Sequence, residues 1–108
     1  MTPHRGEIWW VRLDPTRGSE IKKTRPCLIV GTNVLNERRR SVVVVPLSSA
    51  PQSAPPLLVP VTCAGRKAVA VVDQIRAVTK ERLMRPMGEV SIQELASVED
   101  ALRMVLEL

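Results

Sequence analysis

The sequence predicts a mostly β protein with helices: a small, curved, mainly antiparallel sheet or partly open barrel, followed by one C-terminal helix. Three observations lead to this prediction. Five short runs are rich in β-branched residues, polar turn signals separate them, and only the last segment has the apolar spacing of a long helix. At 108 residues, we expect one domain that spans 1–108.

Each expected strand is short and ends at Gly, Pro, Asn or charged residues. In the first strand, Trp9 shares one face with Val11, while Trp10 shares the other with Arg12. This alternation predicts that Trp9 lies in the core and that Trp10 lies at a rim or an interface. The expected strands cover residues 7–13, 26–31, 42–47, 57–63 and 68–78.

The segments between these strands are expected to be turns and loops, and two helices are expected after the last strand. Residues 33–41 form a polar turn and residues 64–67 a hairpin, while three prolines make residues 49–56 an exposed loop. A short helix is expected from Thr79 through Leu83. The last helix begins at a capping box of Ser91 and Glu94. Its apolar residues repeat at three and four positions: Leu95, Val98, Leu102 and Val105.

Composition and charge favour a nucleic-acid partner. Residues 1–88 carry 15 Lys and Arg against 6 Asp and Glu, a net +9, whereas residues 89–108 carry 1 against 5, a net −4. A strongly basic surface attracts polyanions, although it can also be merely solvated. Aromatic residues make up only 2% of the chain, which predicts an aliphatic core and argues against a platform of stacking aromatics.

The cysteines indicate buried, reduced thiols and no metal site. Cys27 and Cys63 lie in apolar runs without a neighbouring metal-ligand pattern, and His4 is the only histidine. We also expect no membrane partner, because no apolar run reaches the roughly 20 residues that span a bilayer. The chain is therefore expected to be cytoplasmic.

Residues 14–26 form the most informative segment. Pro and Gly mark it as a loop. Within a few residues it concentrates one isolated carboxylate, Glu20, and four cations, Arg17, Lys22, Lys23 and Arg25. Arg25 stands directly before a proline at the start of an apolar strand. A fixed guanidinium beside a basic loop suits a site that handles a phosphodiester.

Five motifs, in this order along the chain, resemble the MazF/PemK toxins of bacterial toxin–antitoxin systems. They are Arg5–Trp9, Leu13–Glu20, Arg25–Val30, Val45–Ser49 and Asp73–Val78. The resemblance implies an SH3-like β-barrel of five to seven strands with appended helices, working as a homodimer. It also implies an endoribonuclease that cuts single-stranded RNA at short sequences without a metal or cofactor. The expected products carry a 2′,3′-cyclic phosphate and a 5′-hydroxyl.

The resemblance also implies the site residues. The family's catalytic arginine maps onto Arg25, and its catalytic threonine maps onto Ser48, which keeps the hydroxyl but lacks the methyl group. The family's Gly-Ser-Glu loop maps onto Gly18–Glu20 and lines the substrate groove. The residues expected to contact RNA are Arg17, Gly18, Ser19, Lys22, Lys23, Ser49 and Gln74.

The chemistry of these residue types assigns them different roles. Arg25 suits charge stabilisation on the phosphorane, and it is a candidate proton donor only in a strongly perturbed environment. Ser48 can orient the phosphate. Glu20 is the one ordinary base among the candidates, but it can equally be a salt-bridge partner of a neighbouring lysine. Gln74 either contacts RNA or satisfies a local backbone group.

The resemblance further implies a protein partner, namely a cognate antitoxin whose disordered, acidic and apolar C-terminal segment folds onto the toxin dimer. Two other functions remain open. A gyrase poison of the CcdB type shares the fold, but that branch is associated with a Trp-Gly-Ile ending, whereas this chain ends Val-Leu-Glu-Leu. A non-catalytic SH3-like module would bind RNA without cutting it.

Overall fold

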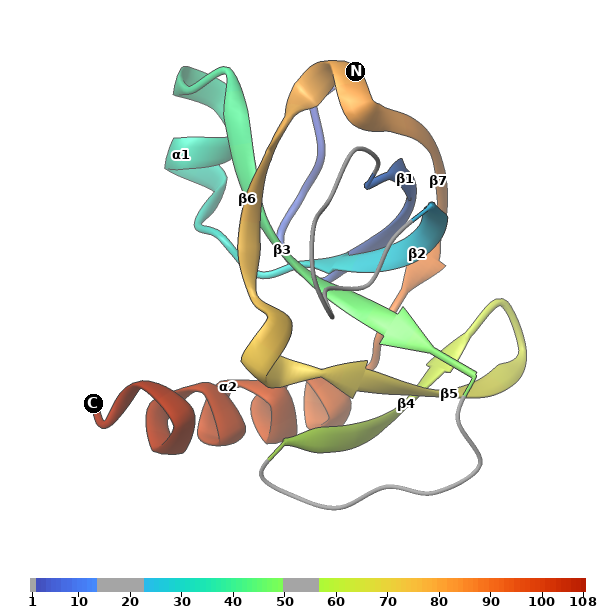
Figure 1. Cartoon of the computed structure of the whole chain (residues 1–108), viewed down its shortest axis with the longest axis vertical. Coiled ribbons are helices and arrows are strands. Elements are labelled where there is room, and N and C mark those ends of the chain that lie inside the picture. Colours follow the sequence, from blue (N-terminus) through green and yellow to red (C-terminus); the bar gives the residue numbers. More distant parts are fainter. Residues whose placement is uncertain (1, 14–22, 50–56) are drawn as a thin grey trace.

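The computed structural model describes residues 2–13, 23–49 and 57–108, and these residues form seven strands, two α-helices and two 3-10 turns (Figure 1). In chain order the elements are β1 Glu7–Arg12, β2 Thr24–Ile29, α1 Asn33–Arg38, β3 Ser41–Ser48, β4 Leu58–Cys63, β5 Arg66–Val71, η1 Val72–Gln74, β6 Arg76–Thr79, η2 Lys80–Arg82, β7 Leu83–Glu89 and α2 Ile92–Leu106. The expected mostly β fold with a C-terminal helix is thus confirmed.

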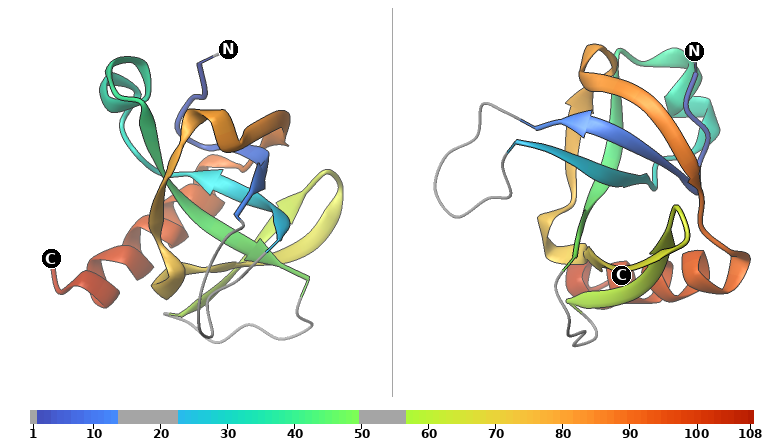
Figure 2. Two further views of the ribbon diagram at one scale, coloured as in Figure 1. Left: turned by 45° about the horizontal axis from the view of Figure 1, so that its top comes forward. Right: turned by 90° about the vertical axis from the view of Figure 1, so that its right-hand side faces the viewer.

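A single curled antiparallel sheet contains all seven strands. Their order is β4-β5-β3-β2-β1-β7, and β6 adds to β3 off this path. The eight-residue β3 organises the sheet because it pairs with β2 on one side and with β6 and then β5 along the other. Because its two ends pair with different strands, β3 crosses the whole sheet and delivers its last residue, Ser48, to the β5 side (Figures 1 and 2).

Strand alternation divides the buried residues between two apolar clusters on opposite faces of the sheet. In β2, Leu28 packs into one cluster, while Cys27 and Ile29 pack into the other. The first cluster is closed by β4, β5 and α2, which lies against that side of the sheet (Figure 2). The second cluster lies among β1, β2, β3 and β6 and contains Trp9, only 4% exposed, as the alternation predicts.

The C-terminal helix begins and packs as the sequence indicates. The Ser91 hydroxyl accepts a hydrogen bond from the Glu94 amide, and the Glu94 carboxylate accepts one from the Ser91 amide, which completes the capping box. Arg5 ties the N-terminal segment to this helix, since its Nη2 lies 2.5 Å from Glu99 Oε2. No helix in the described part of the chain is long and apolar enough to cross a membrane.

The expected polar turn at residues 33–41 is wrong, because its first six residues form the helix α1. Thr32 caps this helix by accepting a hydrogen bond from the Leu35 amide. The buried Asn36 side chain donates to the Gly31 carbonyl at 3.2 Å. A helix of six residues is too short to show an apolar period, so the sequence pattern could not reveal it.

Two further differences concern the sheet. The single strand expected at 68–78 is interrupted by η1, which separates β5 from β6. The short helix expected near 79–83 is confirmed as the 3-10 turn η2, but the strand that follows it, β7, was not expected because it contains Pro86 and Gly88. A proline is tolerated there because β7 is an edge strand that pairs only with β1, with two register irregularities.

Candidate active site

The structure brings Arg25 and Ser48 together. β2 and β3 pair antiparallel with Cys27 opposite Pro46 and Leu28 opposite Val45, and continuing this register by two residues sets Arg25 opposite Ser48. Both residues line one pocket of about 430 Å³. A guanidinium and an alcohol on adjacent strands can therefore reach the same ligand.

The Arg25 side chain has a buried N–H group for which the described residues offer no hydrogen-bond acceptor. Its side chain is partly buried, and its Nε atom is buried without a hydrogen-bond partner in the described residues. Pro26 follows it and fixes the local backbone. A buried N–H that makes no hydrogen bond carries a desolvation cost, which an incoming acceptor removes. This geometry prepares Arg25 to bind an anion.

Ser48 occupies the last position of β3 and is partly buried, and its neighbour Ser49 also lines the pocket. The paired strand β5 places Val69 opposite Ser48, so the hydroxyl sits where the β2 and β5 sides of β3 meet. A serine hydroxyl can donate one hydrogen bond and accept two. Ser48 can therefore position a phosphate oxygen beside Arg25.

Arg76 on β6 is a further cation near this part of the sheet; it is absent from the expected site residues and does not line the pocket. It lies opposite Val44 of β3, and two positions along β6 its neighbour Val78 is buried in the same cluster as Val44. This alternation puts Arg76 on the sheet face that carries Cys27. Arg76 and Val78 are two residues apart on one strand, so their side chains share a face; this spacing is the sequence signal that could have identified Arg76 as a residue of this face.

The pKa of the Cys27 thiol is affected by both guanidinium groups, those of Arg25 and Arg76. Burial raises the pKa of Cys27 from its ordinary 9.0 to about 12, while the nearby charges of Arg76 and Arg25 lower that pKa by smaller amounts. Cys27 Sγ also lies 3.7 Å from the Arg25 carbonyl oxygen. The positive charges of Arg25 and Arg76 therefore both act on the Cys27 thiol. Both cysteines are buried and unpaired, as the sequence predicts.

The raised pKa of Cys27 predicts a loss of stability in alkali. Below pH 9 the thiol is protonated in both the folded and the unfolded chain, so it adds no pH dependence. Between pH 9 and about 12 only the unfolded thiol ionises, so the free energy of unfolding should fall with rising pH by at most about 1.4 kcal/mol per unit. Urea unfolding between pH 8 and 10.5 measures this slope.

The matched variant for this experiment is Cys27→Ala, which removes the ionising group. We expect the parent protein to lose its stability advantage over the variant progressively above pH 9. Identical slopes for the two proteins would show that the burial of Cys27 does not control its ionisation.

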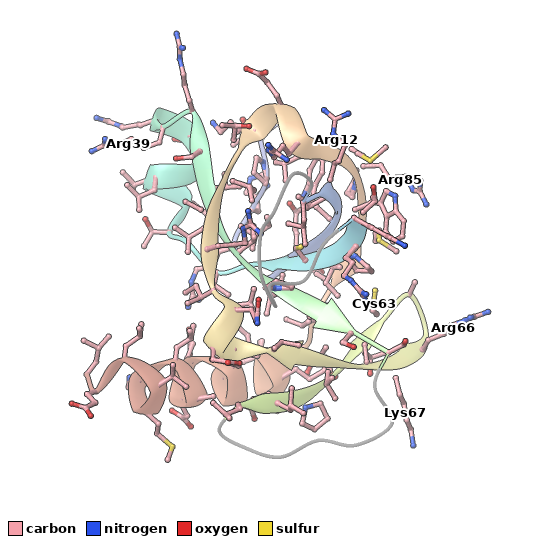
Figure 3. All side chains as sticks on the ribbon, in the orientation of Figure 1. Arg12, Arg39, Cys63, Arg66, Lys67 and Arg85 are labelled. Carbon is pink, nitrogen blue, oxygen red and sulfur yellow. The ribbon has the colours of Figure 1, made fainter. Side chains whose placement is uncertain are left out.

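Apolar side chains form most of the pocket beyond Arg25 and Ser48. The remaining lining residues are Trp10, Thr24, Pro26, Leu47, Ser49, Cys63, Ala64, Arg66, Lys67, Ala68 and Met87. Figure 3 shows Cys63, Arg66, Lys67 and Arg85 along the same side of the molecule. The pocket therefore joins an apolar wall to a cationic rim, and its residues come from β1, β2, β3, β7 and the β4–β5 hairpin.

The other expected site residues differ in what the structure says of them. Lys23 is exposed, has a positive φ of 67°, and its carbonyl accepts a hydrogen bond from the Leu13 amide. Gln74 ends η1 and is partly buried. Neither lines the pocket, and their contacts with RNA stay predictions. Five expected residues lie outside the described residues: Arg17, Gly18, Ser19, Glu20 and Lys22.

No three His, Cys, Asp or Glu side chains gather as a possible metal-binding group in residues 2–13, 23–49 and 57–108. The groups that line the pocket are instead guanidinium, ammonium, hydroxyl and thiol. Such a set can bind and stabilise an oxyanion, and the partly buried Arg25 is its strongest donor.

Comparison with known sequences gives consistent results. The family described as PemK-like, MazF-like toxin of type II toxin–antitoxin system matches residues 4–106. The endoribonuclease MazF9 of Mycobacterium tuberculosis is 40% identical over 113 residues, which cover 96% of each chain. The endoribonuclease toxin MazF of Escherichia coli K12 is 26% identical over 105 residues, covering 96% of this chain and 94% of the relative.

Solved structures share the fold. MazF from Deinococcus radiodurans superimposes with a TM-score of 0.90 at 23% identity, covering 100% of this chain and 99% of that chain. A mycobacterial endoribonuclease in complex with its cognate antitoxin gives a TM-score of 0.78 at 26% identity, covering 99% of this chain and 95% of that chain. The first likeness concerns the fold alone, and the second comes from a protein that binds an antitoxin.

Proposed function

This chain belongs to the family of PemK-like and MazF-like toxins of type II toxin–antitoxin systems, and from that membership we propose that it is a toxin that cuts single-stranded RNA internally. The observation that carries the proposal is the pocket that Arg25 and Ser48 both line; the Nε–H of Arg25 is buried and has no hydrogen-bond partner within the part of the chain that the structure describes. The basic charge of residues 1–88 supplies the attraction to a polyanion.

The proposed reaction is a transesterification. The ribose 2′-oxygen attacks the adjacent phosphorus, the bond from phosphorus to the 5′-oxygen breaks, and the products carry a 2′,3′-cyclic phosphate and a 5′-hydroxyl. Arg25 stabilises the negative charge that develops on the non-bridging oxygens, and Ser48 donates a hydrogen bond that fixes the phosphate. Neither role requires a metal or a cofactor.

Proton transfer needs one group at each of the two reacting oxygens. The 2′-hydroxyl must lose a proton and the leaving 5′-oxygen must gain one. Glu20 is our candidate for the base, because it is the only carboxylate in the Gly-Ser-Glu loop. Arg25 is the candidate for the proton donor. The proposed RNA contacts are Arg17, Gly18, Ser19, Lys22, Lys23, Ser49 and Gln74.

The protein partner in this proposal is a cognate antitoxin. A mycobacterial relative of the same fold binds one, and an acidic segment is complementary to the cations that would otherwise hold RNA. The toxin itself is proposed to work as a homodimer in the cytoplasm. Binding of the antitoxin would therefore exclude the substrate by occupying the same cationic surface.

One experiment tests the function against its two rivals. The purified protein is incubated with a long single-stranded RNA in EDTA, and the ends of the fragments are mapped. We expect internal cuts with 5′-hydroxyl ends. RNA that is retained but intact would identify a binding module, and inhibition of DNA gyrase without RNA cleavage would identify a poison of the CcdB type.

Arg76 is proposed to strengthen RNA binding by adding positive charge on the sheet face that carries Cys27, the residue two positions from Arg25, although Arg76 does not itself line the pocket. Arg76→Gln should weaken binding of a 2′-deoxy RNA analogue, and the slope of log K against log salt should shrink by about 0.7. Fluorescence anisotropy at several salt concentrations measures both quantities.

Arg76→Lys should restore the salt slope, because the charge returns without the planar fork. Arg40→Gln is the matched control, since Arg40 is exposed and lies outside the sheet. If Arg76→Gln and Arg40→Gln bind the analogue equally tightly, Arg76 has only a structural role.

A further inference from the structure

The pocket extends well past the pair that is proposed to act on the phosphate, and its extension contains Trp10. This residue lies opposite Pro26 in the β1–β2 register, one position beyond Arg25 along β2. Its indole is only partly buried, whereas the adjacent Trp9 is buried in the core. Trp10 is thus an aromatic side chain that lines the same pocket as Arg25 and Ser48, and strand alternation places its indole on the sheet face that carries Pro26.

A neighbouring cation packs over the ring of Trp10. The Arg85 guanidinium carbon lies 5.6 Å from the centroid of the Trp10 ring, and the two residues are paired between β1 and β7. Pro26, Leu47 and Met87 also line the apolar wall. A flat, rigid, apolar surface of this kind is suited to packing against a planar ring.

Cations border the same pocket on the β4–β5 side. Ala64 and Gly65 have positive φ values of 51° and 79°, which is the geometry of a tight two-residue hairpin turn. The turn places the exposed Arg66 and Lys67 at the pocket rim (Figure 3). A ligand with one planar ring and one anionic group would satisfy both the wall and the rim.

We propose that this extension is a base-binding subsite, in which the base of a nucleotide next to the cleaved bond packs against Trp10 while its phosphate lies near Arg66 and Lys67. The inference rests on the proposed RNA substrate and adds to it a residue that determines where the RNA is cut. A nucleotide fits better than an apolar peptide side chain, because it offers both a planar ring to the apolar wall and an anionic phosphate to the exposed Arg66 and Lys67, whereas the side chain would use the wall alone. The subsite is also continuous with Arg25 and Ser48, as one strand of RNA requires.

The test uses an RNA oligonucleotide that carries 2′-deoxyribose at the mapped cleavage position, so that it binds without being cut. Trp10→Leu should raise its Kd by about 5- to 150-fold, the range for loss of one stacked base, while Trp10→Phe should keep most of the affinity. Met84→Ala is the control, because Met84 is 56% exposed on β7 and does not line the pocket. Circular dichroism melting verifies that each variant is folded.

Abasic substitutions in the same oligonucleotide locate the base. At one flanking position, removal of the base should weaken binding to the parent protein but not to Trp10→Leu. At all other positions, the two proteins should respond alike. If no position shows this coupling, or if Trp10→Leu binds the intact oligonucleotide as tightly as the parent, the base-binding subsite is disproved.

Sedimentation of each variant distinguishes a second copy of the chain as the occupant. A change in oligomeric state in Trp10→Leu, with unchanged RNA affinity per folded dimer, would overturn the proposal. Failure of the general function is separately visible, because in that case the parent protein itself leaves RNA uncut. If the parent cuts RNA and only the coupling is absent, the nuclease proposal stands and the subsite does not.

Discussion

Arg25→Ala is expected to lower the rate constant of RNA cleavage by about two to three orders of magnitude, the scale for removing a preorganised donor to a developing oxyanion. The physical reason is that Arg25 lines the pocket with a planar fork of donors, and its buried Nε–H has no hydrogen-bond partner among the described residues. Single-turnover cleavage of a labelled RNA with excess protein measures the effect on the chemical step.

Two variants show whether the effect of Arg25 depends on its shape and position. Arg25→Lys keeps the charge without the fork, so we expect activity between that of the parent and that of Arg25→Ala. Arg39→Ala removes an exposed arginine at the end of α1, on another part of the surface (Figure 3), and should cleave at the parental rate. Parental activity in Arg25→Ala would remove this residue from the reaction.

Ser48→Ala is expected to lower the same rate constant by about one to three orders of magnitude. The alanine cannot donate to a phosphate oxygen, yet it leaves the pairing between β3 and β5 unaffected because that pairing uses backbone groups. The substrate Kd should change less than the rate constant, since the hydrogen bond strengthens as negative charge develops. Measuring both constants by single-turnover titration separates these effects.

Ser48→Thr restores the hydroxyl and should retain activity, because only a methyl group is added at an open pocket. Ser41→Ala supplies the matched control at the opposite end of the same strand, where Ser41 pairs with Thr79. Should Ser48→Ala cut RNA as fast as Ser41→Ala, the hydroxyl at position 48 takes no part in catalysis.

Local sequence patterns were sufficient for the elements that carry the two catalytic candidates. The alternation of Trp9 and Trp10 predicts which side chain is buried, and the structure confirms it. The β-branched runs that contain Cys27 and Val44 predict two buried strands, and the capping box at Ser91 predicts the start of α2. Each of these signals depends only on neighbours within a few residues, where physical rules are strong.

The pocket itself could not be predicted in this way, because residues far apart in the chain form it. Met87 comes from β7, a strand that the sequence does not predict because it contains a proline. Arg66 comes from a hairpin that pairs with β3, a strand far from it in the sequence. Composition gives little information about Trp10. A low overall aromatic content argues against a platform of several stacking aromatics, whereas the proposed subsite needs only one tryptophan for one base.

The central position of β3 has a consequence for how the molecule comes apart. Val44 belongs to one apolar cluster and Val45 to the other, so neither half of the protein can melt while the other keeps that strand intact. Amide hydrogens in the core strands of a domain exchange with free energies that approach that of global unfolding. We therefore expect the amides of Val44 and Val45 to be among the most protected in the molecule, so that the strand leading to Ser48 stays formed until the domain unfolds as a whole.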